Sequence, residues 1–555
     1  MRTPAEGSSI IGNQALRSGA RVKIISDDPT QIEARWVHLQ AALDHATPTG
    51  ELPAALRFTA IDFARDALKA GCAVLAIQAL EALVGLTPDE AAVWQLLGFA
   101  YGDEQDILKA VGAFAQAARL APHEPVTALA HARSSLDAGF QAANLFEHAL
   151  QVAPDNLEAV NGWASSLVAQ GQPAAAEDLL AHTLMRRPDW LLGHKQLAAL
   201  RWTSGDAHNF GRSYAQACAV QPQNLPLRLA WFSAVAQAHD WEAALEIIAN
   251  GEKIIGASSG FVVARAFVAS ESGDRARAEE LFVQTASIKD DVLGIAHMRH
   301  GLRTAQWDKA ECLALELMKG PSAQMIWPYL SLIWRLRGDA QAPWLDGAPP
   351  YIRAFDLDYS PGELDELAAV LRRLHTARAP YIEQSVRGGT QTDTDRHLFF
   401  RAEPEIQNVR AKVCAAIREY VAGLPPHVPG HPLLGVSRGR IRFSGSWSVR
   451  LRRQGFHVSH THPMGWISSA LYVSLPGPDQ LGAAPAGWIR FGAPPPGLGL
   501  NLPAYGQFEP KPGRLILFPS TMWHETLPFD AGERLVIAFD VMRPRVSASM
   551  LPPPT

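Results

Sequence analysis

Cysteine is scarce in this chain of 555 residues, which contains only four: Cys72, Cys218, Cys312 and Cys414. They lie far apart and no two form a CxxC pair. This spacing argues against a disulfide framework and against a thiolate zinc site. We therefore expect the protein to work in a reducing compartment, and we predict the cytoplasm.

Long hydrophobic runs are also missing. The first 25 residues, MRTPAEGSSIIGNQALRSGARVKII, are polar and basic with scattered apolar positions, so they lack the continuous apolar stretch of a secretory signal. We interpret residues 1–30 as a disordered lead-in. The longest apolar run, Ala70 to Leu86, is interrupted by Gln78 and Glu81. Such a run is too short and too polar to span a bilayer, so no membrane partner is expected.

An excess of charge of one sign is absent as well. The formal net charge is -5, with 19% charged and 47% hydrophobic residues, as in an ordinary globular protein. A chain with this balance has no broad attraction for nucleic acid, and we expect no nucleic-acid partner. Its length predicts two or more units, each with its own core.

Prolines recur regularly in the N-terminal half. They stand at Pro88, Pro122, Pro154, Pro188 and Pro222, with gaps of 34, 32, 34 and 34 residues. A fixed period of this size indicates stacked units of supersecondary structure. Each proline ends a helix, because it lacks an N–H group and its φ angle is fixed.

The clearest repeat unit resembles the tetratricopeptide consensus at each signature position. Its residues are Trp94, Leu97, Gly98, Tyr101, Ala110, Phe114, Ala117 and Pro122. Large side chains on one face of a first helix would pack on a second helix that approaches over the small Gly98 and Ala110. Later units are looser versions of this pattern. We predict an α-solenoid of tetratricopeptide-type helical hairpins over residues 31–340.

The resemblance implies a partner for this array. Tetratricopeptide hairpins stack into a superhelix whose concave groove commonly holds a peptide or a partner helix. A protein or peptide bound by the groove is therefore our leading hypothesis. The alternative is that the array packs against the rest of the chain or mediates self-association.

The character of the sequence changes between Gly338 and Tyr351, where Gly, Pro and Asp accumulate and helical periodicity ends. We predict a linker at 341–360 and a second domain at 361–548. Helices are expected at 363–376 and 405–421. Short apolar strands are expected at 447–451, 467–475, 487–491, 514–518 and 534–540. This pattern is typical of a β-barrel or β-sandwich with supporting helices.

Histidines cluster in this second domain, in GFHVSHTHPMGW and in FPSTMWHE. In an extended segment His460 and His462 leave the same face and could share a metal, whereas His457 has the opposite parity to His460. His524, just past an expected strand, is the natural third ligand. Ten residues later comes Arg534, whose planar fork can clamp a carboxylate with two hydrogen bonds.

The first histidine pair departs from a common iron motif. An open non-haem iron site needs three protein ligands on one face, usually two histidines and a carboxylate. Here an H-x-H stands where H-x-D/E is common. Two readings stay open: His462 completes a three-histidine face, or it lies beside a metal that His460 and His524 bind almost alone.

The segments GSWSVRLRRQGFHVSHTHPMGWISSALYVSLP, GWIRFG and PGRLILFPSTMWHETLPF, followed by ERLVIAFD, resemble the 2-oxoglutarate/Fe(II) oxygenase family. The resemblance implies a double-stranded β-helix, or jelly roll. It also implies metal binding by His460, His462 and His524, and 2-oxoglutarate binding by Arg534 with Tyr472 nearby. The cofactor is then Fe(II), and the co-substrates are 2-oxoglutarate and O2.

We therefore predict a multidomain α plus β protein, an Fe(II)/2-oxoglutarate-dependent dioxygenase. The leading hypothesis is a hydroxylase that modifies a protein or peptide recruited by the repeats and releases succinate and CO2. One alternative is a small-molecule oxygenase whose repeats serve assembly. The other is a non-catalytic repeat scaffold with a degenerate barrel.

Overall fold

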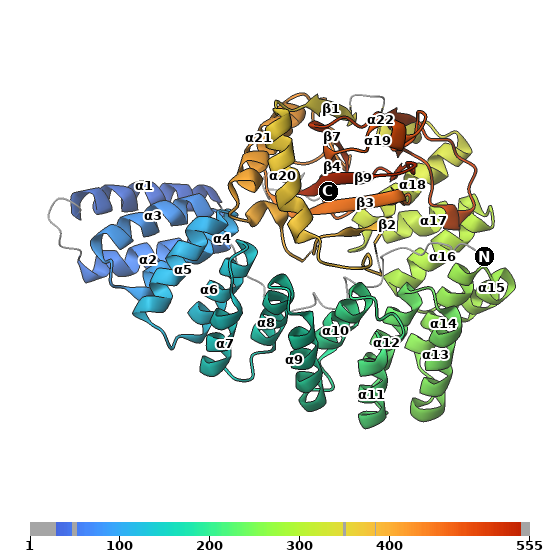
Figure 1. The fold of residues 1–555 in the computed structure, drawn as a ribbon, viewed down its shortest axis with the longest axis horizontal. Helices are drawn as coiled ribbons and strands as arrows, with labels where there is room; N and C mark the ends of the chain where they lie inside the picture. Colours follow the sequence, from blue (N-terminus) through green and yellow to red (C-terminus); the bar gives the residue numbers. More distant parts are fainter. Residues whose placement is uncertain (1–28, 47–52, 348–350, 383, 394, 545–555) are drawn as a thin grey trace. The chain divides into compact units, whose positions relative to one another are not determined.

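The computed structural model describes residues 29–46, 53–347, 351–382, 384–393 and 395–544 (Figure 1). The predicted lead-in lies outside them except for its last two residues, as do residues 348–350 of the predicted linker and residues 545–548 of the predicted second domain. The chain divides into two compact units. One holds Ala181–Leu398 and the described residues from Asn408 onward, and the other holds the described residues up to Leu180 with Phe399–Gln407.

Helices make up most of the described residues from Pro29 to Asp346 (Figure 1). They are α1 Pro29–Ala46, α2 Ala54–Lys69, α3 Ala73–Leu86, α4 Ala91–Asp103, α5 Ile107–Leu120, α6 Pro125–Asp137, α7 Ala143–Val152, α8 Leu157–Ala169, α9 Pro173–Arg186, α10 Leu191–Thr203, α11 Arg212–Val220, α12 Leu225–Gln237, α13 Trp241–Ile255, α14 Ser259–Ser272, α15 Arg275–Gln284, α16 Asp291–Arg303, α17 Trp307–Leu317, α18 Ala323–Arg337 and α19 Gln341–Asp346. Among the described helices, none has the length and apolar character needed to cross a bilayer.

The close approach of paired helices explains the small residues of the repeat. A Cβ atom added to Gly98 of α4 would lie 2.6 Å from Cε1 of Phe114 on α5. An added Cβ at Gly162 of α8 would likewise overlap the ring of Phe146 on α7. Glycine is thus required where an aromatic ring of one helix meets the backbone of the next. The predicted α-solenoid is confirmed.

Helix starts in the array follow side-chain capping. The residue before the helix accepts a hydrogen bond from a backbone N–H of the first turn at α8, α12, α13, α15 and α16. The capping residues are Asn156, Asn224, Asp240, Asp274 and Asp290. Each cap accepts from a backbone N–H that has no partner within the helix, and the capping residue therefore marks where the helix begins.

Two antiparallel sheets form the C-terminal part of the chain. Their strands are β1 Arg353–Asp356, β2 Val386–Gln391, β3 Phe443–His457, β4 Gly465–Ser474, β5 Ile489–Phe491, β6 Gly506–Phe508, β7 Arg514–Pro519, β8 His524–Thr526 and β9 Glu533–Met542. The larger sheet has the order β1-β7-β4-β9-β3-β2, and the smaller one β6-β5-β8. Helices α20 Pro361–Leu374, α21 Pro404–Ala422 and the short α22 Pro478–Leu481 accompany them. The predicted fold class, a helical solenoid followed by an antiparallel β domain with supporting helices, is confirmed.

Within one unit, the last array helices share a hydrophobic core with the β domain. Trp523 and Leu498 of the β domain pack with buried residues of α16, α17, α18 and α19. The indole Nε1 of Trp523 donates to the carbonyl of Pro328 in α18 at 2.8 Å. The Arg335 guanidinium donates to the carbonyls of Gly492 and Pro503. These helices are therefore part of the structure that supports the β domain.

A buried ion cluster strengthens this junction. Glu271 of α14 accepts hydrogen bonds from Arg299 and Arg303 of α16. Arg303 in turn donates from Nε to the carbonyl of Gly497 at 2.8 Å. Burial by itself raises the pKa of Glu271, but the two guanidinium groups outweigh it and lower this pKa to about 2. The carboxylate thus holds both arginines, one of which contacts the β domain.

We expect Glu271→Gln to lower the free energy of unfolding by about 3 kcal/mol, because breaking a buried ion pair leaves unpaired charge behind. Urea denaturation followed by circular dichroism measures this. Below pH 4.5 the difference should shrink as the pH falls toward 2, since the lowered pKa stabilises the fold only while Glu271 is ionised. The control Glu316→Gln removes an exposed pair with Lys319 and should leave the free energy of unfolding nearly unchanged, because solvent screens such a pair. Equal effects of the two substitutions would refute a role for the cluster.

Candidate metal centre

Three imidazoles converge between the two sheets. The ligand nitrogens of His460, His462 and His524 all lie within 4.8 Å of one another. The ring centroids are 4.2 Å apart for His460 and His524, 5.0 Å for His460 and His462, and 5.3 Å for His462 and His524. The structure therefore brings together the three histidines that the sequence predicted as ligands.

Backbone hydrogen bonds hold these segments together. The N–H of His460 donates to the carbonyl of His524 at 3.0 Å, and the N–H of His524 donates back to the carbonyl of His460 at 3.0 Å. The N–H of His462 donates to the carbonyl of Ser520 at 2.9 Å. His460 and His524 thus form an isolated antiparallel bridge, which fixes the positions of their side chains before any metal arrives.

Two of the rings are oriented by backbone carbonyls. His460 Nδ1 lies 2.8 Å from the carbonyl of Val458, and His524 Nδ1 lies 3.0 Å from that of Met522. A carbonyl can only accept, so the proton sits on Nδ1 and Nε2 keeps its lone pair. Burial, together with the neighbouring histidines, holds the pKa of both rings well below the ordinary value. Both imidazoles are neutral, which is the form that binds a metal.

The third ring is oriented by a carboxylate. His462 Nδ1 lies 2.7 Å from Oδ2 of Asp540, and Oδ1 of Asp540 accepts from the Ser468 hydroxyl at 2.5 Å. Burial lowers the pKa of His462, but the charge and hydrogen bond of Asp540 outweigh it and raise this pKa. Trp447 stacks on the same ring at 5.5 Å. A carboxylate behind a histidine in this way fixes the ring and makes the facing nitrogen a better ligand.

Asp540 and Ser468 were not among the site residues predicted from the sequence. Asp540 stands six residues after Arg534 on β9, so the two side chains leave the same face of that strand. It also pairs with Ser468 of β4 in the register of the larger sheet. The period of two along β9 could have indicated Asp540, whereas its contact with His462 depends on how the strands pair.

His457 lies outside the group of three. Its Nδ1 is 3.0 Å from the Ser385 hydroxyl, whose oxygen is 3.3 Å from Nε2 of His460. Burial and then the positive charge of Arg534 lower the pKa of His457 to about 3. His457 is thus a neutral residue beside the centre, linked to His460 through the Ser385 hydroxyl.

Arg534 is a buried cation without a counter-ion among the described residues. It is 1% exposed, and no described carboxylate lies within 4.0 Å of it. Nη1 donates to the carbonyl of Gly487 at 2.8 Å, and Cζ lies 4.9 Å from the centroid of the Tyr472 ring. The Arg534 Nε and the Tyr472 hydroxyl, both buried, have no hydrogen-bond partner.

An unpaired buried guanidinium is costly, and a carboxylate is the group that matches its planar fork. The free Nε of Arg534 and the hydroxyl of Tyr472 provide further donors for such an anion. Arg534 shares a strand face with Asp540, and Asp540 contacts His462, so the anion site and the histidine group lie on the same side of β9. The residues present therefore fit a divalent metal together with an acid bound beside it.

Family models match both parts of the chain. Residues 445–540 match the model described as "Putative 2OG-Fe(II) oxygenase", and residues 141–200 match a tetratricopeptide repeat model. The first match spans His460, His462, His524, Arg534 and Asp540. The chain thus carries a tetratricopeptide region and a C-terminal domain of the 2-oxoglutarate/Fe(II) oxygenase class. No curated protein matches it at a significant level.

Solved structures resemble parts of the chain. A tetratricopeptide repeat protein from Parabacteroides merdae is 17% identical, with 43% of this chain and 95% of that one covered and a TM-score of 0.28. MamA from Desulfovibrio magneticus is 14% identical, with coverage of 30% and 95% and a TM-score of 0.27. A prolyl-4-hydroxylase from Pseudomonas putida is 19% identical, with coverage of 35% and 93% and a TM-score of 0.24.

We expect Asp540→Asn to weaken binding of a divalent metal about 10-fold, because the residue that orients a ligating histidine loses its charge. Anaerobic calorimetry with Fe(II), or with Mn(II) as a stable substitute, measures the affinity. Asp479→Asn, which neutralises an exposed carboxylate of the same domain, is the matched control. Unchanged affinity in Asp540→Asn would exclude the role assigned to this contact.

Proposed function

We propose that the chain is an Fe(II)/2-oxoglutarate-dependent dioxygenase in which His460, His462 and His524 bind the iron. Arg534 and Tyr472 would hold the distal carboxylate of 2-oxoglutarate. When bound, the iron would supply activation of O2, coupled to conversion of 2-oxoglutarate into succinate and CO2. The residues of the chain bind and orient these groups and exclude water from them.

One observation carries the proposal. A buried guanidinium without a carboxylate partner, Arg534, lies on the same strand face as Asp540, the residue that orients His462. A dicarboxylic acid could place one carboxylate at the metal bound by the histidines and pair its other carboxylate with Arg534. A monocarboxylic acid bound at the histidines, or a metal alone, would leave Arg534 unpaired.

We further propose that His462 is a ligand. Its Nδ1 faces Asp540, so Nε2 is the nitrogen available to a metal shared with His460 and His524. Three neutral imidazoles leave the charge of a divalent cation uncompensated. Asp540 would supply a negative charge through His462, in place of the carboxylate that a common H-x-D/E motif would bring into direct contact.

For the substrate, we propose a protein or peptide recruited by the tetratricopeptide array and hydroxylated at one side chain, in a reducing cytoplasmic setting. The repeat region supports this, since such arrays commonly bind peptides. Oxidation of a small metabolite is the second candidate. It is favoured by the packing of α16 to α19 against the β domain, which gives these helices a supporting role.

Anaerobic addition of Fe(II) and 2-oxoglutarate should produce a visible charge-transfer absorption. We expect Arg534→Gln to weaken 2-oxoglutarate binding at least about 30-fold, since loss of a buried charged contact costs about 2 kcal/mol or more. Its affinity for Fe(II) should stay near that of the wild type. Arg452→Gln, on the exposed side of β3, is the control. Absence of the absorption in the wild-type protein would refute the proposed cofactor pair.

The substrate proposal needs its own experiment. Extracts treated with wild-type protein, Fe(II) and 2-oxoglutarate should contain a polypeptide whose mass rises by one oxygen, while extracts treated with His524→Ala should not. Peptide mass spectrometry identifies the modified side chain. If only small molecules gain oxygen, the second candidate is correct. Removing residues 1–340 is unsuitable as a test, because it would delete half of the core around Trp523.

A further inference from the structure

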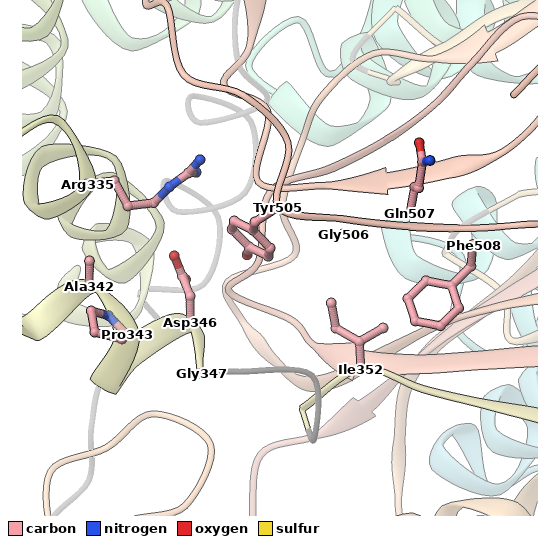
Figure 2. A pocket seen from close by; sticks show the side chains of 10 residues that line it. All are labelled: Arg335, Ala342, Pro343, Asp346, Gly347, Ile352, Tyr505, Gly506, Gln507 and Phe508. Carbon is pink, nitrogen blue, oxygen red and sulfur yellow. The ribbon is translucent and has the colours of Figure 1, made fainter. Parts of the chain in front are cut away.

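A cavity of about 400 Å³ lies where α18 and α19 meet β6, all within one unit (Figure 2). Its wall includes Arg335, Asp346, Tyr505, Ile352 and Phe508. None of these residues belongs to the metal centre. A cavity of this size, between two parts of a fold and lined by apolar side chains with a few polar groups, is typical of sites for small molecules.

Asp346 is the buried charge of this cavity. It is 8% exposed, and its Oδ2 accepts from the Ser331 hydroxyl at 2.6 Å. Among the described residues no cation lies within 4.0 Å of it, and its Oδ1 has no hydrogen bond. Burial raises the pKa of Asp346 to about 6, so the carboxylate is mostly ionised at neutral pH. One of its oxygens is therefore free to accept from a ligand.

Arg335 supplies the opposite charge. Its two terminal nitrogens donate to the carbonyls of Gly492 and Pro503, and Cζ lies 4.9 Å from the centroid of the Tyr505 ring. These contacts fix the guanidinium while leaving three of its five N–H groups for other acceptors. Figure 2 shows Arg335 and Asp346 projecting into the same space beside Tyr505.

Arg335 and Asp346 face the same cavity but do not form an ion pair with each other. Arg335 influences the pKa of Asp346, yet the two side chains are more than 4.0 Å apart. Separated opposite charges in a partly enclosed site are best satisfied by a ligand that carries both signs. An amine alone would be repelled by Arg335, and a carboxylate alone by Asp346.

The apolar residues of the cavity wall indicate which side chain the ligand carries. Ile352 and Phe508 present an aliphatic and an aromatic surface on the side of the cavity away from Arg335 (Figure 2). We propose that this cavity binds a free α-amino acid with an apolar side chain. Its ammonium group would meet Asp346, its carboxylate would meet Arg335, and its side chain would pack on Ile352 and Phe508.

Calorimetry with L-leucine on the full-length protein tests this. We expect one molecule bound per chain, with at least about 10-fold weaker binding of 4-methylpentanoate, which lacks the amine, and of 3-methylbutylamine, which lacks the carboxylate. Asp346→Asn keeps the size of the side chain and the contact with Ser331, but it should weaken leucine binding at least about 10-fold. Asp479→Asn, exposed and outside the cavity, should leave the affinity unchanged.

A second variant separates loss of the site from loss of the fold. A Cβ added to Gly506, which lines the cavity, would lie at an ordinary contact distance of 3.7 Å from Cδ1 of Ile352, so Gly506→Leu should be tolerated and should fill the cavity beside Ile352. Both variants should keep the wild-type melting temperature measured without leucine. Failure of the wild-type protein to bind L-leucine, or equal affinity for L-leucine and 3-methylbutylamine, would overturn the proposal. Equal leucine affinity in the wild type and Gly506→Leu would overturn it too.

Discussion

The pair of backbone hydrogen bonds between His460 and His524 is the constraint on which the candidate centre depends. It joins the segment between β3 and β4 to the start of β8, and β8 belongs to the smaller sheet. The bridge therefore fixes the His460 and His524 imidazoles, which come from two different segments, relative to each other. The contact of His462 with the carbonyl of Ser520 adds a third point of attachment. The positions of three ligands therefore follow from main-chain geometry rather than from the metal.

Strand β9 carries two charged residues of opposite sign on one face. Asp540 is negative and faces His462, while Arg534, on the same face of β9, is positive and lacks a described counter-ion. In a poorly solvated interior, each charge strongly favours a ligand of opposite sign. Strand β9 therefore favours binding of a cation near Asp540 and of an anion near Arg534. The proposed metal and dicarboxylic acid would supply that cation and that anion.

Much of this could be predicted from the sequence, because it is local. The proline period and residues such as Gly98 indicate the repeats, and the apolar runs locate the main strands. The spacing of the histidines and Arg534 indicates the chemistry. Asp540 was missed because its role depends on the register between β4 and β9, and a strand pattern does not reveal which strands pair. The contact of Trp523 with Pro328 joins residues 195 positions apart, and no local pattern encodes it.

The core around Trp523 also has a consequence for how this chain can change over generations. Tetratricopeptide arrays ordinarily gain or lose whole hairpins, since each unit contacts only its neighbours. Here a hairpin inserted between α16 and α18 would separate Arg303 from Gly497 or Pro328 from Trp523. The number of repeats next to the β domain is therefore fixed by contacts outside the array. Natural variants of different length should carry their insertions and deletions before α14.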